Sequence, residues 1–229
     1  MNNILDGLIG AFDLLFSFDR EIYRIIGLSL IVAFSSTAIS ALLGIPAGVL
    51  IGMNSFKGKK LLVRLIYTLM SLPPVIAGLV IFLLLSRKGP LGFMGILFTP
   101  AAMIIAQVSL ITPIITGIVY NSVKEKGQLI RSVGKTLGAG RIEILLLLVA
   151  ELRVSILTGV ITGFGRATSE VGAIMLVGGN IKGHTRVMTT TIAMLQGMGE
   201  YTTAIALGFV LLTISFIINS LLYKYQRVE

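Results

Sequence analysis

Five long apolar runs restrict the fold of this chain more than any other feature of its sequence. They cover about residues 22–53, 61–85, 93–120, 154–177 and 203–223. About 20 apolar residues in a helix suffice to cross the hydrocarbon core of a bilayer, where helices satisfy all of their own backbone hydrogen bonds. Only 13% of the residues are charged, whereas soluble domains contain about a quarter. The sequence therefore predicts an all-α integral membrane protein with five transmembrane helices.

The residues ahead of the first run, 1–21, have a different character. Ile4–Phe18 is apolar at helical spacing, but it carries two aspartates and is too short to span a membrane. We expect an amphipathic helix lying in the outer interface, although an ordinary packing helix would show the same pattern. The start lacks the positive n-region of a cleaved signal peptide, so we expect a mature chain whose transmembrane domain covers 22–229.

Glycines and prolines modify the predicted helices. Gly44, Gly48 and Gly52 recur every four residues in the first run, a spacing that allows close approach of a second helix. Pro73 and Pro74 interrupt the second run, and two missing N–H donors should break the helix there.

Residues 121–153 form a basic segment between two predicted spans. Its apolar residues Leu129, Ile130, Val133 and Leu137 follow helical spacing, and the pattern ends at 138–140, Gly-Ala-Gly. This predicts a helix–glycine–helix unit that protrudes from the membrane and meets a soluble partner. Its basic residues are Lys124, Lys126, Arg131, Lys135, Arg141 and Arg153.

The distribution of charge predicts the orientation. Twelve lysines and arginines fall on the side of the 54–60 loop, the basic segment and the carboxyl terminus, and six fall on the other side. Cytoplasmic loops carry the excess of positive charge, so the amino terminus is expected outside and the carboxyl terminus in the cytoplasm. The same distribution accounts for the net charge of +9 without a nucleic-acid partner.

The fourth run is the polar one. Arg166 and Glu170 lie one helical turn apart near its middle, where each charge would cost several kcal/mol, about 3 on insertion scales, if it faced lipid. Two interpretations stay open: a neutralising pair that fixes helix packing, or part of a substrate pathway or gate. The candidate pathway residues are Thr162, Arg166, Thr168, Ser169 and Glu170.

The sequence offers little for an enzyme. Gly134-Lys135-Thr136 resembles the end of a P-loop, but the glycine required earlier in that motif is absent. There is no cysteine and a single histidine, His184, which we interpret as a solvated loop residue. No catalytic triad or metal-ligand cluster is apparent, so we expect no catalysis, metal or cofactor in this chain.

Residues 135–141, Lys-Thr-Leu-Gly-Ala-Gly-Arg, resemble the coupling loop of the permeases of ABC importers. That family has a Glu-Ala-Ala triplet, then a glycine, then a Leu-Pro pair. Gly138 matches the glycine, whereas Ser132, Val133 and Gly134 stand at the triplet and 150–151 is Ala-Glu.

Further segments narrow the resemblance. Residues 72–78 and 89–92 are similar to the second span and outer turn of molybdate, tungstate and sulfate permeases. Residues 165–173 and 177–181 are similar to the fourth span of that group, and the Ser-Glu-Val-Gly-Ala and Gly-Gly-Asn-Ile forms are closest to tungstate-type permeases.

The resemblance implies a type I ABC importer permease in a prokaryotic inner membrane, surrounded by membrane lipid. It implies a second copy of the chain, two cytoplasmic subunits that bind ATP and Mg²⁺, and an external oxyanion-binding protein. Alternating access would carry a tetrahedral oxyanion, most closely tungstate, with molybdate or sulfate as alternatives. The residues expected to contact the ATPase are Leu129, Ser132, Val133, Gly134, Leu137, Gly138, Ala139 and Arg141.

Two other classes of function remain compatible with the residues. A stand-alone anion channel or secondary transporter would also place charges at mid-membrane, as Arg166 and Glu170 are placed. A membrane scaffold or sensor would also present a basic segment to a partner. Flux without an ATPase would identify the first class, and a chain that is not needed for uptake would identify the second.

Overall fold

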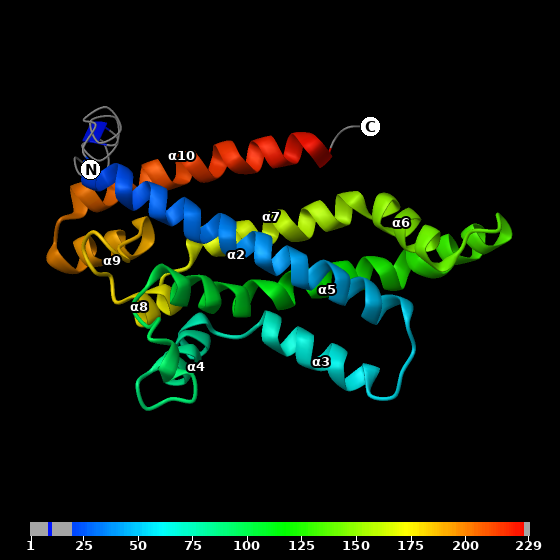
Figure 1. Cartoon of the computed structure of the whole chain (residues 1–229). Coiled ribbons are helices and arrows are strands. Elements are labelled where there is room, and N and C mark those ends of the chain that lie inside the picture. The colour runs from blue at the N-terminus through cyan, green and yellow to red at the C-terminus, as the bar shows by residue number, and fades with distance from the viewer. Residues whose placement is uncertain (1–8, 11–19, 227–229) are drawn as a thin grey trace.

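The computed structural model describes residues 9–10 and 20–226, and this part of the chain forms helices and turns without a strand. Figure 1 shows an elongated bundle in which α2, α5, α7 and α10 run lengthwise, while α4, α8 and α9 gather near one end. The elements are α2 (Arg20–Met53), α3 (Lys59–Met70), α4 (Pro74–Leu85), the 3₁₀ turn η1 (Gly92–Met94), α5 (Pro100–Thr136), α6 (Arg141–Glu151), α7 (Arg153–Ser169), α8 (Gly172–Gly178), α9 (Met188–Met198) and α10 (Tyr201–Gln226).

Among the residues that the structure describes, three single helices, α2, α5 and α10, are long and apolar enough to cross a membrane. Two bent pairs, α3 with α4 and α6 with α7, also qualify if each pair is one span, which gives up to five crossings. The predicted fold class is confirmed on length and composition. The predicted helix at Ile4–Phe18 lies outside the described residues, apart from Ile9 and Gly10.

Helix α5 is the centre of the bundle and contacts α2, α3, α4, α6, α7 and α8. The glycine stripe on α2 faces it, as the spacing predicted. A Cβ atom at Gly48 would lie 2.8 Å from the Thr116 carbonyl oxygen and from Val119 Cβ, and one at Gly52 would approach Val123 within 2.6 Å of its Cβ. The absence of side chains at these positions therefore brings α2 and α5 together.

The second span is broken at its prolines. Helix α3 ends at Met70, α4 begins at Pro74, and the two axes differ by 102°. Pro73 is extended, at φ −60° and ψ 130°, because it precedes another proline. Pro74 then occupies the first helical position, where its missing N–H costs nothing.

The prediction of one helix over 154–177 is wrong. Helix α7 ends at Ser169, Glu170 is extended, and α8 restarts at Gly172. The Glu170 side chain accepts a hydrogen bond from the Ala173 N–H at 3.0 Å, and its carbonyl accepts one from the Thr189 hydroxyl at 2.9 Å. These bonds replace the intrahelical bonds that the break removes, so the backbone polar groups of Ala173 and Glu170 are paired within the protein.

Two further boundaries differ from expectation. The segment 178–196, between the fourth and fifth predicted spans, is more than a connection, because it contains α9, whose Met188, Thr190 and Leu195 are buried. The third span begins at Pro100 rather than near residue 93, and it continues without interruption through residue 121 to Thr136. The first half of the basic segment is thus part of a membrane-crossing helix.

Candidate functional site

The end of α5 reaches beyond any bilayer that the helix could cross. Its 37 residues span roughly 55 Å at 1.5 Å per residue, whereas the hydrocarbon core is about 30 Å thick. Because α5 is one continuous helix, its protruding end is rigidly connected to its membrane-embedded half. A force on that end would therefore be transmitted to the bundle.

Gly138 ends this helix in a left-handed turn. Its φ is +79°, and its N–H donates to the Lys135 carbonyl at 3.0 Å while the Ala139 N–H donates to the Gly134 carbonyl at 2.9 Å. This pair of bonds is the Schellman motif, in which glycine is favoured because other residues are strained at positive φ.

Helix α6 returns against α5 to form what we call the coupling hairpin, residues 121–151. A Cβ at Gly134 would lie 3.1 Å from Ile144 Cγ1, so the helices are in close contact there. The Gly140 N–H donates to the Glu143 carboxylate at 2.6 Å, which caps the start of α6.

Apolar side chains are exposed on the coupling hairpin. Leu129, Leu137 and Ile142 are 70%, 78% and 74% exposed, and Leu146 is also largely exposed. Of the residues predicted to contact an ATPase, Gly134 is buried between the helices and Ala139 is half-buried. The others lie on the surface of the hairpin: Leu129, Ser132, Val133, Leu137, Gly138 and Arg141. Ile142 and Leu146 were missed, although an apolar run directly after a glycine turn could have indicated them.

The predicted pathway residues do not form a single cluster. Thr162, Arg166 and Ser169 share one face of α7, which is at least partly exposed, whereas Thr168 lines an internal cavity. Their hydroxyls donate to carbonyls of their own helix, as from Thr162 to Thr158 at 2.8 Å and from Ser169 to Gly165 at 3.0 Å. Such bonds are common in membrane helices, so the hydroxyls alone do not define a ligand site.

Glu170 connects three helices. Its carboxylate lies 3.6 Å from the Arg166 guanidinium on α7, bonds to the Ala173 N–H at the start of α8, and its carbonyl bonds to Thr189 on α9. The side chain is 4% exposed, whereas that of Arg166 is 36% exposed. Glu170 is therefore the buried residue of the pair and stabilises the break between α7 and α8. Arg166 is the partly exposed residue and faces outward from the chain.

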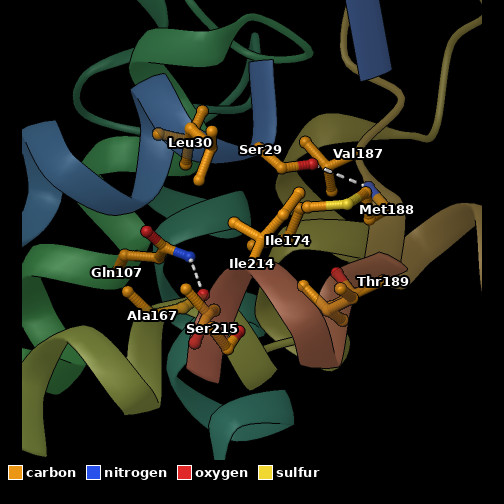
Figure 2. Close-up of a pocket in the computed structure, with 13 residues that line it drawn as sticks. Ser29, Leu30, Gln107, Ala167, Ile174, Val187, Met188, Thr189, Ile214 and Ser215 are labelled. Atoms are coloured by element: carbon orange, nitrogen blue, oxygen red, sulfur yellow. Dashed lines mark hydrogen bonds between the residues drawn. The ribbon is translucent and has the colours of Figure 1, made fainter. Parts of the chain in front are cut away.

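A polar contact that the sequence did not indicate lies beside this break. Figure 2 shows Gln107 of α5 pointing toward Ala167, whose carbonyl accepts its side-chain N–H at 2.8 Å. The Ser36 hydroxyl of α2 donates to the other end of the amide at 2.5 Å. A buried glutamine thus joins α2, α5 and α7, and the only signal for it was one amide in an apolar run.

The cavity next to Gln107 is small. It measures about 20 Å³ and lies among α2, α5, α7, α8, α9 and α10, with room for about one water molecule. A tetrahedral oxyanion is larger than this cavity. An ion path lined by α7 would therefore follow its exposed polar face, which contains Thr162, Arg166 and Ser169.

The family comparison agrees with this arrangement. The model of the binding-protein-dependent transport system inner membrane component matches residues 44–227, which include both the coupling hairpin and α7. The chain belongs to this family of transport permeases. It is accordingly a multi-pass inner-membrane component, and its relatives are transport subunits rather than enzymes.

Individual relatives share most or all of the chain. The tungstate uptake system permease protein of Peptoclostridium acidaminophilum is 52% identical, over 99% of this chain and 100% of its own length. A probable anion ABC transporter permease protein of Haloferax volcanii is 39% identical over 88% of this chain and 89% of its own. The tungstate uptake system permease protein of Campylobacter jejuni is 34% identical over 99% of this chain and 95% of its own.

Proposed function

We propose that this chain is the permease subunit of an ATP-driven importer that carries tungstate into the cell. Two copies would form the pathway, two cytoplasmic subunits would bind ATP and Mg²⁺, and an external binding protein would deliver the oxyanion. The observation that carries the proposal is the exposed apolar surface of the coupling hairpin, on a helix that also crosses the membrane. The choice of tungstate rests on the names of the relatives over the full chain.

The packing suggests how motion at the coupling hairpin would reach the pathway. Helix α5 contacts α7 closely, since a Cβ at Gly163 would lie 2.7 Å from Ile111 Cγ2. Closure of the ATPase dimer would push the hairpin, and α5 would carry α7 with it. The polar face of α7 would then alternate between access from outside and access from the cytoplasm.

The second copy follows from the same polar face. Arg166 is too costly to leave on lipid, and this chain covers it only in part. A facing copy would enclose the residues that a single chain leaves exposed. We accordingly assign Arg166, Thr162 and Ser169 to the path, Thr168 and Glu170 to its support, and Pro73 with Pro74 to the bend of the second span.

The remaining topology follows from charge. We place the amino terminus and residues 1–21 outside, the transmembrane domain at 22–229, and the carboxyl terminus in the cytoplasm. The binding protein would then dock at the end that holds the α4–α5 and α8–α9 loops.

Replacing Ile142 and Leu146 by serine tests the contact with the ATPase. Both side chains are exposed, so the variant should fold while the ATP-binding subunit no longer co-purifies and substrate-stimulated ATP hydrolysis falls at least about tenfold. The control for co-purification is Phe93→Ser, which removes an exposed apolar side chain at the opposite end and should leave the ATP-binding subunit bound. Normal co-purification and coupling in the double variant would refute the assignment of the hairpin.

Uptake of labelled tungstate by the complete importer tests the substrate. Uptake should need the chain, the ATPase and the binding protein together. Unlabelled tungstate should compete better than molybdate, and sulfate should compete least. Preferential competition by molybdate or sulfate would assign another member of the oxyanion group, and flux without the ATPase would favour a channel or secondary transporter.

A further inference from the structure

A cleft opens between α3 and α5 at the basic end of the molecule. It has a volume of about 750 Å³, within the range of about 300–1,000 Å³ that is usual for ligand sites. Figure 1 shows α3 beside α5, with its first turn next to the α2–α3 loop. The lining residues are Ser55, Phe56, Gly58, Lys59, Lys60, Val63, Arg64, Tyr67, Tyr120 and Lys124.

The cleft is apolar along its walls and cationic at its rim. Phe56, Val63 and the two tyrosines supply the apolar surface, and no aspartate or glutamate belongs to the lining. Tyr67 donates a hydrogen bond to Asn121 at 2.5 Å, which holds the middle of α3 against α5. Lys59 donates to the carbonyls of Gly52 at 3.3 Å and Asn54 at 2.8 Å, so its charge serves the end of α2.

Three other cations in the cleft have no such role. Lys60, Arg64 and Lys124 are exposed, and none of their side chains makes a hydrogen bond or ion pair within residues 9–10 and 20–226. Like charges gathered at one site repel each other, and a bound anion would relieve that repulsion. The cleft therefore has the charge of an anion site.

The faces of α3 place this site beside lipid. Lys60, Arg64 and Tyr67 recur at helical spacing and line the cleft, and the buried Ile66 faces the bundle. The neighbouring stripe of Leu61, Leu65 and Leu69 is exposed, as expected for contact with acyl chains. A molecule in the cleft would thus have its anionic group at the cationic rim and its apolar part continuous with the bilayer.

We propose that this cleft binds one anionic phospholipid, with its phosphate among Lys60, Arg64 and Lys124 and an acyl chain along Val63 and Tyr67. Phosphatidylglycerol is the simplest lipid of this chemistry. Basic pockets between membrane helices are suited to such headgroups, and long basic side chains extend from an apolar surface to reach them. The site depends on the membrane location of the chain and not on which ion is transported.

The absence of tryptophan permits a direct test with the full-length protein. Phe56→Trp places the only tryptophan of the variant in the cleft wall, where it can be excited selectively, and the protein is reconstituted into phosphatidylcholine vesicles. A small fraction of either phosphatidylglycerol or phosphatidylcholine carries bromine on its acyl chain, which quenches tryptophan on contact. We expect half-maximal quenching at a concentration of brominated phosphatidylglycerol at least about fivefold lower than that of brominated phosphatidylcholine. One interfacial cation raises the affinity for an anionic lipid by about that factor.

A matched pair of triple variants separates the cleft from general surface charge. Lys60→Gln, Arg64→Gln and Lys124→Gln together should remove the preference, so that the two brominated lipids quench equally at equal concentration. Lys57→Gln, Lys126→Gln and Lys224→Gln remove three exposed charges that do not line the cleft and should leave the preference intact. Circular dichroism and gel filtration check that both variants are folded.

Three results would overturn the proposal: equal quenching by the two lipids, equal loss in both triple variants, and abolition of the preference by millimolar inorganic phosphate. The second result would show diffuse attraction to the membrane surface. The third would show a site for free phosphate rather than for a lipid.

Discussion

At the scale of residues, Arg166 and Glu170 have different roles although they form one ion pair. Glu170 is buried and makes hydrogen bonds through both its side chain and its carbonyl, so it stabilises the break between α7 and α8. Arg166 is exposed for about a third of its side chain, so it is available to an anion. The two interpretations of the sequence, structural pair and pathway element, therefore apply to different members.

Single substitutions should separate these roles. Glu170→Ala removes the acceptor for the Ala173 N–H and should lower the free energy of unfolding by about 1–2 kcal/mol, as loss of a helix cap does. Arg166→Ala leaves the buried Glu170 carboxylate without its cationic partner and should lower the melting temperature, but the folded protein should in addition take up tungstate at least about tenfold more slowly. Glu170→Gln, which keeps an acceptor, is the control and should be more stable than Glu170→Ala. Normal uptake by folded Arg166→Ala protein would remove Arg166 from the path.

At the scale of elements, glycines decide where helices touch and where they stop. The stripe on α2 brings that helix against α5, and Gly138 ends α5 at positive φ. Gly27 on the same helix as the stripe has no atom within 4 Å of a Cβ. Glycine is therefore required by helix packing at the stripe on α2 but not at Gly27.

Gly48→Ala should destabilise the protein where Gly27→Ala does not. At Gly48 the new methyl would lie 2.8 Å from a backbone oxygen of α5, and overpacking of this kind costs about 1–3 kcal/mol. At Gly27 the space is open, so alanine should be neutral or stabilising by up to about 1 kcal/mol. Thermal denaturation of the two purified variants in one detergent gives the comparison. Equal melting temperatures would mean that α2 and α5 are not in the close contact described.

At the scale of the whole molecule, the basic segments lie at one end. In Figure 1, the α2–α3 loop and the turn between α5 and α6 lie at one end of the bundle, and α8, α9 and the start of α2 lie at the other. Helix α10 runs toward the end that holds the α5–α6 turn. The charge bias read from the sequence therefore corresponds to two separate ends of the bundle. This separation is what an excess of cytoplasmic positive charge requires.

Cysteine labelling should give the orientation directly, because the natural chain contains no cysteine. Ser132→Cys, on the coupling hairpin, should react with an impermeant maleimide only after the cytoplasmic side is opened. His184→Cys, in the α8–α9 loop, should react in intact spheroplasts. Both positions are exposed, so a failure to label would not be due to burial in this chain. The reverse pattern would place the hairpin outside and exclude its contact with a cytoplasmic ATPase.

Much of this architecture could be predicted from local sequence. The apolar runs predicted the membrane class, the glycine spacing predicted the contact of α2 with α5, and Gly138 marked the turn between α5 and α6. Sequence reasoning failed at 154–177, where composition continues smoothly across Glu170 but the chain bends. The break depends on Thr189, nineteen residues away, and no local pattern indicates that bond.

The sequence by itself determined that the chain is a membrane protein and which of its loops are basic. The free energy of transferring an apolar segment from water to lipid, and the charge of each loop, are properties of each segment alone. Only the tertiary structure decided that Glu170 is buried and stabilises the break between α7 and α8. The same holds for Gln107, which joins three helices, and for the cationic cleft between α3 and α5. Each of these depends on groups from separate helices meeting in space, and their hydrogen bonds and packing are specified by the partner rather than by the neighbouring residues.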